Sequence, residues 1–152
     1  REGWLELGKL LATRGQPRPA LQALDKVRPY GAYQAEATLV GLPLRRQLGQ
    51  SQAAIADLEA LTQSQPYLAQ PYFELGSLRL ESRDFPEAER KLRQGLKLEP
   101  GNLAGRLALA RILSERGDWQ QAGPEFEAVA GAGDTALAAQ DRCSHTGAKP
   151  SR

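Results

Sequence analysis

The stretch that decides the fold is residues 72–100, YFELGSLRLESRDFPEAERKLRQGLKLEP. It contains two segments with apolar residues at helical spacing, separated by a short polar turn and closed by Pro100. The first segment carries Leu75-Gly76, and the second carries the small Ala88 with Leu92 one helical turn later. We predict two helices that pair as a hairpin, with Ala88 at their close approach.

The same pattern recurs along the chain with a step of 34 residues. Three columns keep this step: Ala20, Ala54, Ala88 and Ala122; Leu24, Leu58, Leu92 and Phe126; and Gly15, Gly49 and Gly117, with Arg83 in the gap. A fixed period of this size is typical of stacked helical hairpins. The sequence therefore predicts an all-α array over residues 1–136, with repeats at about 1–34, 35–68, 69–102 and 103–136.

The residues in these columns resemble the tetratricopeptide repeat (TPR) family. Its pattern joins an aromatic residue to Leu-Gly, then to a small alanine, a bulky residue and a closing proline. The first and third repeats match it best, through Trp4, Leu7, Gly8, Ala20 and Leu24, and through Tyr72, Leu75, Gly76, Ala88, Leu92 and Pro100. The resemblance implies an α-solenoid of four stacked helix-turn-helix hairpins that form a short right-handed superhelix.

Turn and cap residues predict where the helices begin and end. Gly15 is expected to supply a left-handed stop, and Ser51 and Asp118 are expected to cap the helices that follow them. Pro43 and Gly123-Pro124 fall inside predicted helices, where we expect a kink or a break. The helical pattern fades after residues 131–134, so residues 137–152 are expected to form a short partial cap and a disordered tail.

The aromatic residues are expected to pack rather than to bind a ligand. Trp4 and Tyr72 occupy the aromatic column of the repeat, a position that in this family favours packing inside the hairpin. Phe85 and Trp119 lie one period apart and are expected to wedge between the second helix of one hairpin and the next hairpin.

Composition excludes several classes of function. The net charge of +2 is too small to indicate nucleic-acid binding, and no apolar run approaches the roughly 18 residues that span a bilayer. The single Cys143 excludes an internal disulfide and is compatible with both cytoplasm and periplasm. The excess of arginine over lysine is typical of bacterial proteins, and the lack of methionine, even at residue 1, indicates a piece of a longer or processed protein.

No arrangement of residues indicates catalysis. The only histidine, His145, lies two residues from Cys143 in the expected tail, where no third group would hold a reactive geometry. One Cys and one His fall short of the four ligands of a metal site. We therefore expect no enzyme, no cofactor and no metal.

The candidate site is the face of the first helix of each hairpin, because this family binds peptides in the concave groove that these helices line. One apolar column runs along it, and a second column lies four residues later on the same face: Leu5, Leu39, Phe73 and Leu107, then Lys9, Pro43, Ser77 and Arg111. Two interpretations stay open and are compatible: an apolar groove floor, or half-buried contacts between neighbouring helices. Acidic groups of a partner are expected near Lys9 or Arg111.

The predicted function is a protein-interaction scaffold that binds an extended or helical segment of a partner in this groove. The family's chaperone-binding carboxylate clamp is not expected, because only Lys9 remains among the corresponding residues Leu5, Lys9, Val40, Gln70 and Glu74. The alternative is a non-catalytic arm of a larger enzyme, such as a transferase or hydroxylase. A third reading is weak self-association through the chain ends, where residues 1–34 carry a net charge of +3 and residues 103–136 a net charge of −2.

Overall fold

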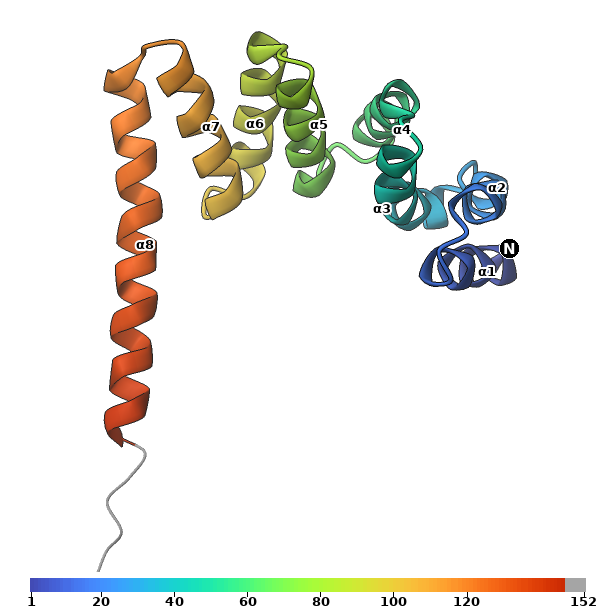
Figure 1. Cartoon of the computed structure of the whole chain (residues 1–152), viewed down its shortest axis with the longest axis horizontal. Helices are drawn as coiled ribbons and strands as arrows, with labels where there is room; N and C mark the ends of the chain where they lie inside the picture. Colours follow the sequence, from blue (N-terminus) through green and yellow to red (C-terminus); the bar gives the residue numbers. More distant parts are fainter. Residues whose placement is uncertain (147–152) are drawn as a thin grey trace, which may run out of the picture. The chain divides into compact units, whose positions relative to one another are not determined.

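The structure is a computed structural model that describes the backbone of residues 1–146 and the side-chain surroundings of residues 1–133. The described part contains eight α-helices and no strand, arranged as consecutive hairpins (Figure 1). The helices are α1 (Glu2–Thr13), α2 (Pro17–Val27), α3 (Gly31–Gln47), α4 (Ser51–Ser64), α5 (Ala69–Glu81), α6 (Phe85–Leu98), α7 (Leu103–Glu115) and α8 (Trp119–Thr146). The predicted all-α fold of four hairpins is confirmed. We call α1, α3, α5 and α7 the A helices and the others the B helices.

The chain divides into two compact units. Unit 1 is Arg1–Leu98 and holds three hairpins, in which each helix packs on the next from α1 to α6. Unit 2 is Glu99–Arg152 and holds the hairpin of α7 and α8. The main stacking contacts inside unit 1 are those of α2 on α3 and of α4 on α5, so each A helix after the first packs against the preceding B helix; α1 also touches α3.

The alanine column marks the helix crossings, as predicted. Ala20, Ala54, Ala88 and Ala122 are all at most 1% exposed. Glycine on the A helix completes the close approach in two hairpins: a Cβ added to Gly8 would lie 2.7 Å from Leu24 Cγ, and one added to Gly76 would lie 2.6 Å from Leu92 Cγ. A side chain at either glycine would force the helices apart or displace the leucine.

The turns inside the hairpins use one left-handed residue each. Gly15, Gly49 and Gly117 have φ of 70°, 70° and 78°, and Arg83 takes the same role in the third hairpin with φ of 59°. The predicted stop at Gly15 is confirmed, since glycine adopts this conformation without the penalty that a Cβ brings.

Of the two predicted caps, one is correct. Asp118 Oδ1 accepts a hydrogen bond of 3.2 Å from the backbone N–H of Gln121 at the start of α8. The cap expected at Ser51 is wrong: Ser51 is the first residue of α4, and Gln50 precedes it without a side-chain cap hydrogen bond.

The breaks expected in two helices are absent. α3 continues through Pro43, and α8 continues through Pro124 and through residues 131–134 as far as Thr146. A proline removes one backbone hydrogen bond. In α3 this loss is offset by packing against both α2 and α4, and in α8 by packing against α7 and by alanines such as Ala128, Ala130 and Ala132. The tail was expected from residue 143, but its first residues continue α8 to Thr146, and residues 147–152 lie outside the described part.

Two of the aromatic predictions are wrong for one reason. Tyr72 is buried as expected, and Phe85 is half-buried. Trp4 is 41% exposed, because the preceding B helix that buries the equivalent Thr38 has no counterpart before α1 in the structure. Trp119 is 67% exposed, and no described hairpin follows α8 to cover it.

Candidate interaction surface

Charged side chains link consecutive A helices in unit 1. Lys9 Nζ of α1 lies 2.8 Å from Glu6 Oε1 on its own helix and also pairs with Glu36 of α3. The Tyr33 hydroxyl of α3 donates a hydrogen bond of 3.2 Å to Glu2 Oε1 of α1. These contacts hold the A helices of the first and second hairpins together along one face.

A similar set of contacts links α3 to α5. Arg46 Nη2 lies 3.7 Å from Glu74 Oε2 and 3.4 Å from Glu81 Oε1. Arg46 therefore bridges two carboxylates that lie seven residues apart, about two turns, along one side of α5.

Carboxylates outnumber cations on this face. We call the five of them the carboxylate ladder: Glu2, Glu6, Glu36, Glu74 and Glu81. Two cations, Lys9 and Arg46, pair with them, and a third, Arg1, lies close enough to Tyr33 to act on its hydroxyl, which leaves two carboxylates in excess. Glu6, Glu36 and Glu81 keep half or more of their side-chain surface exposed, so they remain available to a partner.

The two carboxylates beside Lys9 raise its pKa, mainly through the hydrogen bond to Glu36 and then through the bond to Glu6. Lys9 therefore stays charged throughout the physiological range and is already matched by carboxylates. An acidic partner group would have to compete with Glu6 and Glu36 for the Lys9 ammonium.

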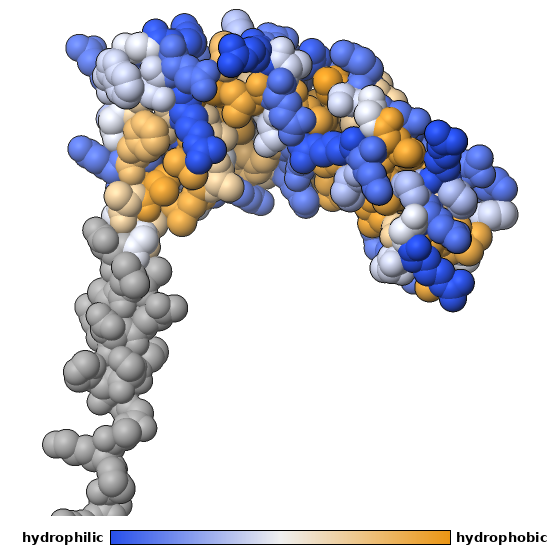
Figure 2. All heavy atoms as spheres, viewed as in Figure 1, coloured by the Kyte–Doolittle hydropathy of each residue, from blue (hydrophilic) through white to orange (hydrophobic). Residues whose placement is uncertain are grey.

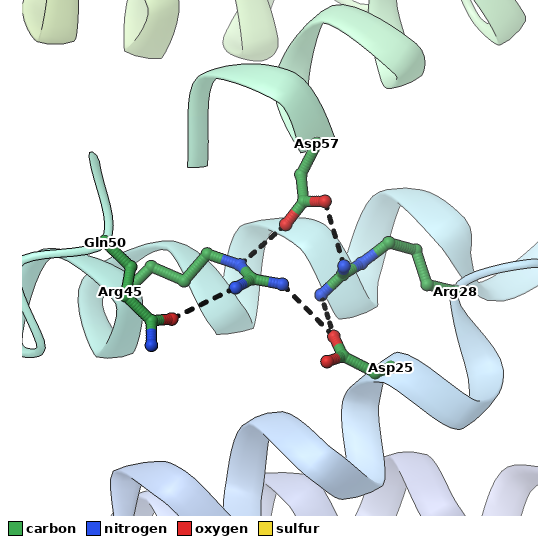
Figure 3. A network of polar contacts seen from close by, with 5 residues as sticks. All are labelled: Asp25, Arg28, Arg45, Gln50 and Asp57. Carbon is green, nitrogen blue, oxygen red and sulfur yellow. Dashed lines mark hydrogen bonds and ion pairs between the residues drawn. The ribbon is translucent and has the colours of Figure 1, made fainter. Parts of the chain in front are cut away.

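A second set of charges lies on the B-helix side of the first two hairpins (Figure 3). Arg28, just after α2, and Arg45 of α3 both pair with Asp57 of α4, at 2.9 Å and 2.7 Å, and both pair with Asp25 of α2. Arg45 Nη1 also donates to Gln50 Oε1 at 3.2 Å. Arg28, Arg45 and Asp57 are at most 18% exposed, so this network mainly fixes how the second hairpin stacks on the first.

One member of the predicted apolar column, Leu5, is buried in the core. Leu5 is 4% exposed and belongs to a core cluster with Ala20, Leu21 and Leu24, so it is a core residue. The reason is its direction: Leu5 points between α2 and α3 rather than away from α2.

The other members of the column in unit 1 are half-buried. Leu39 packs on the cluster of Leu42, Leu58 and Leu75. Phe73 packs on α6, where a Cβ added to Gly95 would lie 2.7 Å from Phe73 Cε1. Ser77 is half-buried, and Pro43 is exposed on α3. Leu39 and Phe73 thus stabilise the stacking while retaining some exposed surface.

In unit 2, Leu107 is half-buried and Arg111 is exposed on α7. The A and B helices of this hairpin are joined by an ion pair of 3.0 Å between Arg106 Nη1 and Glu125 Oε2. The structure therefore places Lys9 and Leu39 in unit 1, on α1 and α3, and Leu107 and Arg111 on the α7–α8 hairpin of unit 2.

Column positions identified the A-helix face but missed the carboxylate ladder. The signal was present in the repeat, since Glu2 and Glu36 lie one 34-residue period apart and Glu6 and Glu74 lie two periods apart. What the sequence did not show is which of these carboxylates face Lys9 and Arg46 across neighbouring helices.

Among the described residues, no group of three or more histidine, cysteine or acidic side chains is placed to hold a metal ion. Within the same residues, no helix has the length and apolar content needed to cross a lipid bilayer.

The chain is similar to a known repeat family and to known repeat structures. Residues 79–140 match the family model described as tetratricopeptide repeat. No curated protein matches the chain. A crystal structure of MamA superposes with a TM-score of 0.80 at 20% identity, covering 90% of this chain and 80% of that one.

Two further MamA structures agree. MamA from Desulfovibrio magneticus RS-1, residue 41 to the end, gives a TM-score of 0.75 at 20% identity, over 88% of this chain and 76% of that one. Another crystal structure of MamA gives a TM-score of 0.73 at 19% identity, covering 99% of this chain and 79% of that one. At such identities the likeness shows the fold alone. Residues 79–140 thus resemble the tetratricopeptide repeat, and the 34-residue period and the likeness to MamA structures show that the chain has the fold of a tetratricopeptide-repeat array.

Proposed function

We propose that this protein is a non-catalytic interaction scaffold that binds a basic segment of a partner protein along the A-helix face of unit 1. The observation that carries the proposal is the excess of carboxylates in the ladder. A TPR fold supports protein partners in general, and the charge on this face selects the kind of segment.

The geometry of the ladder suits an elongated ligand. Its carboxylates are spread over three A helices, so a segment crossing these helices would meet the exposed Glu6, Glu36 and Glu81 in turn. Lysine or arginine side chains spaced along such a segment would pair with exposed carboxylates and would raise the rate of encounter.

Apolar contacts are available beside the charges. Leu10 is 47% exposed and lies one turn from Glu6 on α1. Pro43 is exposed on α3, and Leu39, Phe73 and Ser77 are half-buried on α3 and α5. We propose that these positions contact apolar side chains of the segment; Leu107 and Arg111 are the equivalent residues of α7 in unit 2, and their part in binding stays a prediction.

The test compares two peptides that differ only in charge: one alternates leucine with lysine, and the other has glutamate in place of each lysine. We expect the lysine peptide to bind at least about tenfold more tightly, with an affinity that falls as salt is added. Fluorescence anisotropy of labelled peptides over a salt series measures both.

Charge-neutral variants then locate the site. Glu36→Gln and Glu81→Gln should each weaken binding of the lysine peptide by about two- to fivefold, as for exposed charge pairs. The matched control is Glu87→Gln on α6, whose carboxylate pairs with Arg90 at 2.7 Å outside the ladder. Equal losses in all three variants, or tighter binding of the glutamate peptide, would refute the proposal.

A further inference from the structure

Arg46 is the cation of the carboxylate ladder that joins α3 to α5, and its contacts are long. Its Nη2 atom lies 3.4 Å from Glu81 Oε1 and 3.7 Å from Glu74 Oε2. Both distances exceed the range of about 2.7–3.2 Å for an N–H···O hydrogen bond, so these contacts are ion pairs without a hydrogen bond. Because 35% of the Arg46 side-chain surface is also exposed, Arg46 is held loosely at its carboxylates.

Other cations that link two helices of the array lie closer to their carboxylates. Lys9 of the ladder forms hydrogen bonds with Glu6 and Glu36, and these bonds raise its pKa. Four arginines have a carboxylate of another helix at 2.7–3.0 Å: Arg28, Arg45, Arg79 and Arg106. Arg46 is therefore the cation of this group that an incoming charge would displace most easily.

The repeat itself does not require a cation at this position. The residues 34 positions before and after Arg46 are Ala12 and Leu80. Neither can form an ion pair, so the column contributes no conserved charge to the stacking of the hairpins. Arg46 is specific to the second hairpin, and its role must come from the two carboxylates that it faces.

The geometry of these two carboxylates distinguishes a guanidinium from an ammonium. One nitrogen lies between Glu74 and Glu81, and it is too far from either to donate a hydrogen bond. A guanidinium has several N–H donors set apart in a planar fork and can direct a different nitrogen to each carboxylate. A lysine ammonium has a single nitrogen, so it would meet the same restriction as Nη2 of Arg46.

We propose that Arg46 competes with the partner for Glu74 and Glu81, and that the partner segment carries an arginine that displaces it. This inference rests on the proposed function and adds the identity of one ligand side chain. Arg46 is anchored on α3 and presents only Nη2 to both carboxylates. An arginine of a bound segment has no such anchor, so it can place its fork across the two.

The surroundings allow this exchange of one arginine for another. Hydrophilic side chains cover much of the surface of unit 1 in Figure 2, with hydrophobic side chains between them. Glu81 keeps 60% of its side-chain surface exposed. Arg46 can therefore turn into water without leaving a buried charge behind, and Arg46 acts as a specificity-determining residue of the ladder.

The first test compares the lysine–leucine peptide with an otherwise identical peptide that has arginine in place of each lysine. The arginine peptide should bind the parent chain about three- to tenfold more tightly, because only a guanidinium can donate to both carboxylates. Fluorescence anisotropy of the labelled peptides at one salt concentration measures the ratio.

The second test removes the competitor. Arg46→Gln should bind the arginine peptide about three- to tenfold more tightly than the parent does. The matched control is Arg18→Gln, which removes the same charge from an exposed position of α2 outside the ladder and should change the affinity less than about twofold. Thermal unfolding followed by circular dichroism should be nearly unchanged in both variants, since exposed ion pairs contribute little to stability.

A double variant separates local competition from a general effect of charge. When Glu81→Gln is already present, the gain from Arg46→Gln should fall below about twofold, because the two residues act on each other directly. Equal binding of the two peptides, or an Arg46→Gln variant that binds like the parent or like Arg18→Gln, would overturn this inference alone. A chain that binds neither peptide, with or without Arg46, would overturn the proposed function as well.

Discussion

At the scale of single residues, two buried threonines on the helices of unit 1 differ in how their hydroxyls are satisfied. Thr62 Oγ1 donates a hydrogen bond of 2.8 Å to the backbone oxygen of Glu59. Thr38 Oγ1 is buried and has no hydrogen-bond partner among the described atoms. We expect Thr38→Val to raise the free energy of unfolding by about 1 kcal/mol, because it removes an unsatisfied polar group at nearly constant volume. Thr62→Val should lower it by about 1 kcal/mol. Urea denaturation of both variants measures the difference, and a loss of stability in Thr38→Val would show that its hydroxyl is satisfied in solution.

Arg83 is the other residue whose conformation conflicts with its type. It has φ of 59° in a column that is otherwise glycine. A Cβ in this region costs about 1–2 kcal/mol, partly offset by the lower chain entropy of a non-glycine residue when unfolded. Arg83→Gly should therefore stabilise the protein by about 0.5–1 kcal/mol, and Gly49→Ala should destabilise it by a comparable amount. The melting temperature should rise in Arg83→Gly and fall in Gly49→Ala. A change of the same sign in both variants would contradict the left-handed conformation assigned to Arg83.

At the scale of elements, the network of two arginines and two aspartates fixes the stacking of the first two hairpins. Asp57 accepts from both Arg28 and Arg45 and is 18% exposed, whereas Asp25 is 48% exposed. Asp57→Asn should lower the free energy of unfolding by about 1–3 kcal/mol, because it leaves two half-buried guanidiniums without their main partner. Asp25→Asn should cost less than about 1 kcal/mol. Urea denaturation followed by circular dichroism measures the loss in free energy of unfolding for both variants. Equal losses would contradict the idea that burial makes Asp57 the more important partner.

The same scale shows what the sequence could predict. The 34-residue period placed most helix ends within a few residues, because the columns mark crossings and turns that every hairpin must repeat. It could not foresee that α8 passes through Pro124, since one lost hydrogen bond is small beside the contribution of a long alanine-rich helix. It also missed the exposure of Trp4, because a column predicts burial only where a neighbouring helix is present.

At the scale of the whole molecule, the A-helix face of unit 1 was predictable and its charge was not. Column spacing located Lys9 on that face, but a single sequence does not show that Glu36 of the next hairpin reaches the same ammonium. The ladder arises only when hairpins stack, so its net charge is a property of the array. Under our proposal, this charge makes the expected partner segment basic, whereas the sequence pattern predicted acidic groups near Lys9.

The most direct test of this account is to locate the bound lysine–leucine peptide on the full chain by hydrogen exchange. Amides of α1, α3 and α5 that neighbour the carboxylate ladder should exchange more slowly when the peptide is present, because their local opening would require the peptide to leave. Amides of α2, α4 and α6 should change little. Protection confined to the B helices, or no protection at a peptide concentration that saturates the anisotropy signal, would contradict the claim that the A-helix face binds the partner.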